Sequence, residues 1–145
     1  MRIQLMQSGA ETEMAKILVV DDDMGCRRLT SKVLAIHGYS TISAANGREA
    51  LQAMDQGDVD LVLLDLMMPD MDGLSFMQAM RKHSEWANVP VLVLSGIADL
   101  DVADKVKESG VQGYLVKSRY SIDELLMRVR QQLGNHPDAG RAHHN

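Results

Sequence analysis

Short apolar runs alternate with longer amphipathic segments along most of this chain. The apolar runs predict five strands, at residues 16–20, 39–44, 61–64, 91–94 and 113–116. Between and after them, apolar residues recur near helical spacing and predict five helices, at residues 24–37, 47–56, 74–83, 99–110 (or 101–110) and 122–134. Strict alternation of strand and helix predicts an α/β fold, with a doubly wound parallel sheet and helices on both of its faces.

Cap residues mark the ends of several predicted helices. Asn46 can cap the helix that starts at Gly47, and Ser121-Ile122-Asp123-Glu124 reads as a capping box before the last helix. Gly38 and Gly134 follow predicted helices and can end them. These signals agree with the apolar pattern about where the elements begin and stop.

The start of the first predicted helix carries two further expectations. Asp23 stands directly before it and is expected to cap its N-terminus. Cys26, inside the helix, is expected to pack as a small apolar residue.

Length and composition indicate one globular domain. The chain has 145 residues, of which 46% are hydrophobic and 24% charged, values that suit a single domain with a real core. We expect this domain to span residues 14–134, with flexible extensions at 1–13 and 135–145.

Composition also disfavours several classes of function. No apolar run approaches the roughly 20 residues that span a bilayer, and no signal-peptide pattern opens the chain, so we expect a cytoplasmic protein without membrane association. The single Cys26 cannot form an internal disulfide and fits a reducing compartment. A net charge of −5 disfavours nucleic acid as a partner.

Acidic residues follow two of the predicted strands. Asp21-Asp22-Asp23 closes the run at 16–20, and Asp65 closes the run at 61–64, before a loop that contains Pro69 and Gly73. In an open parallel sheet, ligands bind at the carboxyl ends of the strands. The pattern therefore predicts a cation site beside a carboxylate that could act as a nucleophile.

Five signals in sequence order resemble the receiver domain of two-component response regulators, and together they extend over about residues 14–134. They are Val20-Asp21-Asp22, Asp65 before Met68-Pro69-Asp70-Met71-Asp72-Gly73, Ser95-Gly96, Tyr114 and Lys117. The resemblance implies a flavodoxin-like (βα)5 fold with strand order 2-1-3-4-5.

The resemblance also implies a role for each matching residue. Asp65 corresponds to the phosphoacceptor. Mg²⁺ would be held by Asp21, Asp22, Asp65 and the backbone carbonyl of Met67. The remaining matches are the residues that contact the phosphoryl group or report the switch, namely Ser95, Lys117 and Tyr114.

A receiver of this kind is a signalling switch rather than an enzyme with an external substrate. It would catalyse only its own phosphorylation and dephosphorylation, on Asp65 with Mg²⁺. A sensor histidine kinase or a histidine phosphotransfer protein would be the donor, and a downstream protein the target. A phosphorylation-dependent dimer is a further expectation, whereas nucleic acid and membrane are not expected partners.

The sequence leaves two other interpretations of its function open. A phosphatase of the haloacid dehalogenase type also uses an aspartate nucleophile, but it needs a second Asp two residues later, where this chain has Met67. The chain could also be the receiver of a longer transcriptional regulator. Residues 135–145 are too few to fold as an effector, so we expect a stand-alone receiver.

Some residues depart from the family pattern or have simpler explanations. Proline usually follows the conserved lysine, but here Ser118 follows Lys117. A cis peptide before a residue other than proline costs roughly 3–4 kcal/mol, so we expect a trans bond and an altered loop. Asp70 and Asp72 fit turn positions, and Tyr114 could be only a half-buried strand aromatic.

Overall fold

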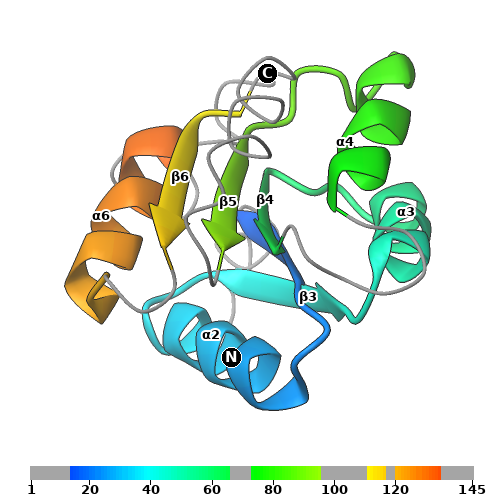
Figure 1. Ribbon diagram of the computed structural model, residues 1–145. Helices are drawn as coiled ribbons and strands as arrows, with labels where there is room; N and C mark the ends of the chain where they lie inside the picture. The colour runs from blue at the N-terminus through cyan, green and yellow to red at the C-terminus, as the bar shows by residue number, and fades with distance from the viewer. Residues whose placement is uncertain (1–13, 66–72, 96–110, 117–119, 135–145) are drawn as a thin grey trace, which may run out of the picture.

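The computed structural model describes residues 14–65, 73–95, 111–116 and 120–134 (Figure 1). The strands are β2 (Lys16–Val20), β3 (Ser40–Ala44), β4 (Leu61–Asp65), β5 (Val91–Ser95) and β6 (Gly113–Val116). The described helices are α2 (Met24–Ile36), α3 (Gly47–Gln56), α4 (Gly73–Lys82) and α6 (Ile122–Leu133). The helix expected near residues 99–110 and the two terminal extensions lie outside the described residues.

The strands form one five-stranded parallel sheet in the order β3-β2-β4-β5-β6. Numbered along the chain, this is the expected order 2-1-3-4-5. Helices α2 and α6 cover one face of the sheet, and α3 and α4 cover the other (Figure 1). The prediction of a doubly wound, flavodoxin-like α/β fold is therefore confirmed.

The central strands are apolar throughout because both faces of the sheet are covered. Successive side chains of a strand point to opposite faces. Leu18 and Val20 of β2 thus pack in the core cluster under α3 and α4, whereas Ile17 and Val19 pack in the cluster under α2 and α6. An apolar layer therefore packs against each face of the sheet, and the polar side chains at its carboxyl edge are attached to this packed core.

Three expected N-caps are confirmed by hydrogen bonds. The Asn46 side chain accepts from the backbone N–H of Glu49 at 2.9 Å, and the Ser121 hydroxyl accepts from that of Glu124 at 3.1 Å. Asp23 Oδ1 accepts from the backbone N–H of Cys26 at 3.0 Å. Each bond satisfies a donor that the first turn of a helix otherwise leaves without an intrahelical partner.

The expectation that Cys26 is packed as an apolar residue is wrong, because its side chain is exposed. Cys26 lies in the first turn of α2, ahead of Leu34, the residue that this helix buries against the sheet. Leu29 and Ile36 are also largely exposed, at 61% and 70%. Helix α2 thus contacts the core through a narrow stripe, and apolar spacing alone overstates how much of it is buried.

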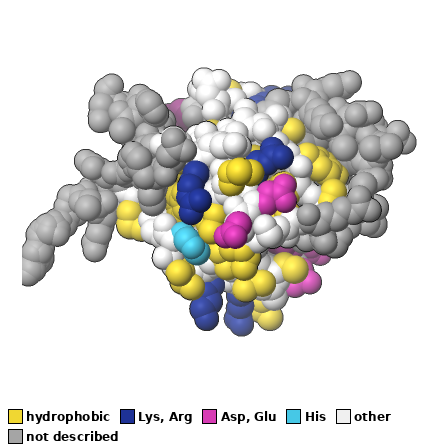
Figure 2. Space-filling model, turned by 90° about the vertical axis from the view of Figure 1, so that its left-hand side faces the viewer, with side chains coloured by type: hydrophobic (Ala, Val, Ile, Leu, Met, Phe, Trp, Pro, Cys, Tyr) yellow, Lys and Arg dark blue, Asp and Glu magenta, His cyan; other side chains and the backbone are white. Residues whose placement is uncertain are grey.

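The face around α6 mixes apolar and charged side chains. On this helix, Ile122 is 52% exposed and Met127 46%. Figure 2 shows exposed apolar atoms interspersed with both acidic and basic side chains on the described part of this side of the molecule. None of the described helices is long and apolar enough to cross a membrane.

Candidate metal-binding site

Strand register brings two carboxylates to the same edge of the sheet. Strands β2 and β4 are parallel neighbours with Val20 aligned to Leu64. The next residues are Asp21, which directly follows β2, and Asp65, which is the last residue of β4. The opposite ends of the two strands are fixed by a reciprocal pair of hydrogen bonds. Lys16 N–H donates to Asp60 Oδ2 at 2.8 Å, and Asp60 N–H donates to the Lys16 carbonyl at 2.8 Å.

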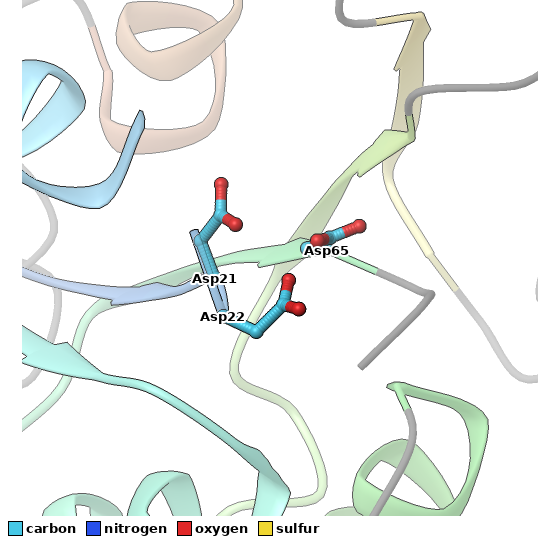
Figure 3. Close-up of side chains that lie close together, drawn as sticks. All are labelled: Asp21, Asp22 and Asp65. Atoms are coloured by element: carbon cyan, nitrogen blue, oxygen red, sulfur yellow. The ribbon is translucent and has the colours of Figure 1, made fainter. Parts of the chain in front are cut away.

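Three carboxylates meet at this edge (Figure 3). One oxygen from each of Asp21, Asp22 and Asp65 lies within 4.8 Å of the others. Asp21 and Asp65 are only 4% and 6% exposed, whereas Asp22 is exposed. The sequence prediction that the two acidic strand ends come together is confirmed.

This donor set suits a hard divalent cation. Carboxylate oxygens are the ligands that Mg²⁺ prefers, and Mg²⁺ commonly uses only one or two of them and completes its coordination with water and phosphate. Two nearly buried carboxylates side by side also repel each other in a medium that screens charge poorly. A bound cation would offset that repulsion, and the exposed Asp22 leaves the site open to solvent on one side.

The turn from β2 into α2 is fixed by several hydrogen bonds around Asp21. Its backbone N–H donates to the Ala44 carbonyl of β3 at 3.1 Å. Its Oδ1 accepts from the backbone N–H of Asp23 at 2.9 Å, and its carbonyl accepts from Arg27 Nη1 at 2.7 Å. Asp23, predicted as a helix cap, therefore also orients the Asp21 carboxylate.

Other candidate residues lie on the neighbouring strands. Ser95 is the last residue of β5, one position beyond Leu94, which pairs with Asp65. Tyr114 lies in β6, half-buried against the cluster under α3 and α4. Backbone register thus sets Ser95 at the same edge as the acidic residues. Outside the described residues lie Met67, Asp70, Asp72, Lys117 and Ser118.

Arg27 contacts this site and was not among the residues that sequence reasoning selected. Its guanidinium reaches back from the second turn of α2 to the carbonyl of Asp21. The one sequence signal was a basic residue shortly after an acidic strand end. Two adjacent arginines, Arg27 and Arg28, share that feature, and sequence alone does not tell which one turns inward.

Comparison with known proteins connects this geometry to one family. The family model described as "Response regulator receiver domain" matches residues 17–130. Among curated relatives, the probable transcriptional regulator ycf27 of Porphyridium aerugineum is 42% identical over 120 residues, which cover 81% of this chain and 48% of that protein. Sporulation initiation phosphotransferase F of Bacillus subtilis is 37% identical over 118 residues, 81% of this chain and 93% of that protein.

Solved structures of response regulators are also similar to this chain. Chemotaxis protein CheY4 of Vibrio cholerae superposes with a TM-score of 0.77 at 34% identity, covering 83% of this chain and 99% of that one. Response regulator TrrA of Thermotoga maritima, solved in complex with Mg²⁺ and BeF, gives a TM-score of 0.73 at 32% identity, covering 83% of this chain and 100% of that one. The chain spans about half the length of the ycf27 relatives, since 48% of the Porphyridium protein is covered.

Proposed function

Because the chain belongs to the response regulator receiver family, we propose that it is a phosphorylation-dependent switch in a two-component system, with Asp65 as the phosphoacceptor. The observation that carries the assignment is the convergence of Asp21 and Asp22 on Asp65 within 4.8 Å. A single strand-end aspartate would repel an anionic phosphoryl donor. A cation held by the three carboxylates would offset that repulsion.

Asp65 is suited to accept a phosphoryl group by its position and burial. A carboxylate oxygen of Asp65 would form a bond to phosphorus while the bond between phosphorus and the donor's leaving group breaks, and the leaving group would take the electron pair. The carboxylate is 6% exposed at the end of β4. The rigid strand fixes its position, and burial limits the water that could compete for the phosphoryl group.

The residues that would hold Mg²⁺ are Asp21, Asp22, Asp65 and the backbone carbonyl of Met67. Bound there, Mg²⁺ would supply positive charge for the phosphoryl oxygens, which is the main requirement of phosphoryl transfer. The three carboxylates carry a formal charge of −3, and Lys117 would add the remaining positive charge. The Thermotoga relative, solved with Mg²⁺ and BeF, supports this choice of ion.

Ser95, Lys117 and Tyr114 are proposed to turn phosphorylation into a change of surface. Ser95 and Lys117 would donate hydrogen bonds to phosphoryl oxygens. Movement of Ser95 toward Asp65 would then alter the packing of Tyr114, which is only half-buried on β6. A local charge would thus bias a two-state element at the partner-binding surface.

A sensor histidine kinase or a histidine phosphotransfer protein is the proposed donor, in the cytoplasm, and a second protein is the proposed target. Apart from this self-modification, we propose no enzymatic activity. Two arrangements are represented among the relatives: sporulation phosphotransferase F is matched over 93% of its length, and the ycf27 regulators over about half. Family membership removes the support for a haloacid dehalogenase phosphatase.

The phosphoacceptor is tested by labelling with radioactive acetyl phosphate in the presence of Mg²⁺. Asp65→Asn, which is nearly isosteric, should lose nearly all of the acid-stable, base-labile label. Asp55→Asn is the matched control, because Asp55 is an exposed aspartate on α3, and it should be labelled like wild type. Equal labelling of Asp65→Asn and wild type would contradict the assignment.

A further inference from the structure

Arg27 lies next to the acidic site and donates a hydrogen bond to the main chain there. Its Nη1 donates to the backbone carbonyl of Asp21 at 2.7 Å. The side chain is partly buried, and a charged donor to a neutral carbonyl makes a strong bond. The bond joins α2 to Asp21, the residue that directly follows β2.

This bond completes a set that holds Asp21 from three directions. The Asp21 N–H is tied to Ala44 of β3, its carboxylate is oriented by the N–H of Asp23, and its carbonyl is tied to Arg27. Without Arg27, the Asp21 carbonyl would lose this hydrogen bond, and the peptide between Asp21 and Asp22 would be held only through the bonds of its flanking residues, Asp21 and Asp23. That peptide determines where the Asp22 carboxylate points, and both carboxylates belong to the site.

We propose that Arg27 is a positioning residue for the cation site: it acts through the backbone of Asp21 and sets the geometry of the Asp21–Asp22 pair. The inference rests on the proposed function, since it assumes that this pair binds Mg²⁺. Mg²⁺ requires near-ideal octahedral geometry, so a small displacement of the pair weakens binding. Residues that orient metal ligands typically contribute 10- to 100-fold to metal affinity.

The charge of Arg27 and its hydrogen bond have opposite expected effects on Mg²⁺ affinity when Arg27 is removed. The guanidinium carries +1 close to an anionic site, so its loss would strengthen the attraction for Mg²⁺ if charge were its only effect. Loss of the hydrogen bond would weaken Mg²⁺ binding. The sign of the change therefore separates the two roles, and Arg28 provides the matched control, because it has the same charge and is exposed on the adjacent position of α2.

The experiment is isothermal titration of the metal-free full chain with MgCl₂, for wild type, Arg27→Gln, Arg28→Gln and Arg27→Lys. We expect Arg27→Gln to bind Mg²⁺ about tenfold more weakly, and Arg28→Gln to bind equally or slightly more tightly. Arg27→Lys keeps the charge and can still donate a hydrogen bond, but without the planar guanidinium geometry, and should fall between wild type and Arg27→Gln. If Arg27→Gln does not fold, as judged by circular dichroism, a several-fold loss in folded Arg27→Lys carries the test.

Two results would overturn the inference in distinguishable ways. If wild type binds Mg²⁺ and Arg27→Gln binds it as well as Arg28→Gln does, Arg27 does not position the site, and the proposed function is untouched. If wild type shows neither a heat of Mg²⁺ binding nor a rise in melting temperature with Mg²⁺, the cation site itself is wrong, and the proposed function fails with it.

Discussion

Replacing Asp65 with Asn should make the metal-free protein more stable, although it removes the proposed phosphoacceptor. In the absence of a cation, Asp65 lies against Asp21 and Asp22, all within 4.8 Å. Two of the three are nearly buried, so water screens their repulsion incompletely. Asn is nearly the same size as Asp and carries no charge, so the change removes repulsion with little change in packing.

The size of the effect follows from the spacing of the carboxylates. Two unit charges at 4.8 Å, the upper limit of the separation between the carboxylate oxygens, repel by about 1 kcal/mol at the dielectric constant of water and by about 3 kcal/mol at an effective constant of 20. Asp22 is exposed, so its repulsion of Asp65 lies near the lower of these two values. Asp65 also interacts with at least one other group, and any stabilisation from it that Asn does not keep would reduce the gain. We therefore expect a net gain of about 1–3 kcal/mol in the free energy of unfolding.

Urea denaturation in EDTA, followed by circular dichroism, measures this gain. At the usual dependence of stability on urea for a small domain, the midpoint should rise on the order of 1 M with an unchanged slope. Asp55→Asn removes the same charge from an exposed position on α3 and should shift the midpoint very little. Saturating Mg²⁺ should reduce or reverse the advantage, because wild type then gains binding energy that the variant lacks.

An equal or lower midpoint for Asp65→Asn than for wild type in EDTA would refute the reasoning. So would an equal rise in Asp55→Asn, since the cause would then be net charge and not the cluster. A changed slope would point to an altered denatured state, and the comparison would have to be repeated by thermal unfolding.

Two further predictions concern Mg²⁺ and alkaline pH. Mg²⁺ should increase the free energy of unfolding of wild type by mass action, by about 2.7 kcal/mol at one hundred times the dissociation constant, and so raise its melting temperature. Asp22→Ala should lose most of this gain, and a wild-type melting temperature indifferent to Mg²⁺ would argue against the site. Burial raises the pKa of Tyr39, against the opposing effect of Arg130, so the neutral phenol is favoured in the folded state and the stabilisation is present below pH 10, then lost as pH rises through the folded-state pKa. Wild type should therefore lose more stability than Tyr39→Phe between about pH 9 and 11, and parallel pH profiles would contradict this.

Most of the fold could be predicted because local signals and the apolar pattern agreed. The short apolar run Leu61–Leu64 was predicted as a strand and lies in β4, and Asn46 and Ser121 form the caps that their residue types favour. The wrong predictions concerned the ends of elements, because backbone hydrogen bonding decides which residue is the last in a strand or helix. Tyr39 was placed in a strand, but its N–H bonds the Leu34 carbonyl and closes the end of α2.

Asp65 shows the same limit at the site. The sequence placed it just after a strand, whereas it is the last strand residue and pairs with Leu94. The acidic cluster itself was predictable, since it needs only that Asp21 and Asp65 end adjacent parallel strands. The hydrogen bond from Arg27 to the Asp21 carbonyl could not be predicted, because it depends on the orientation of α2 relative to β2 and on the rotamer of Arg27. The exposure of Leu29 and Ile36 likewise depends on how α2 lies across the sheet.

The pairing of β2 with β4 has a consequence for how the site comes into being during folding. These neighbours in the sheet are far apart in the chain. The hydrogen bond between Lys16 and Asp60 spans 44 residues, with α2, β3 and α3 between the two strands. Closing so long a loop is entropically costly and tends to be slow. Asp21 and Asp22 follow the first of these strands and Asp65 ends the second, so a chain in which β2 and β4 have not yet paired lacks the complete acidic set. Competence to bind Mg²⁺ is therefore acquired in one step, when the two central strands meet.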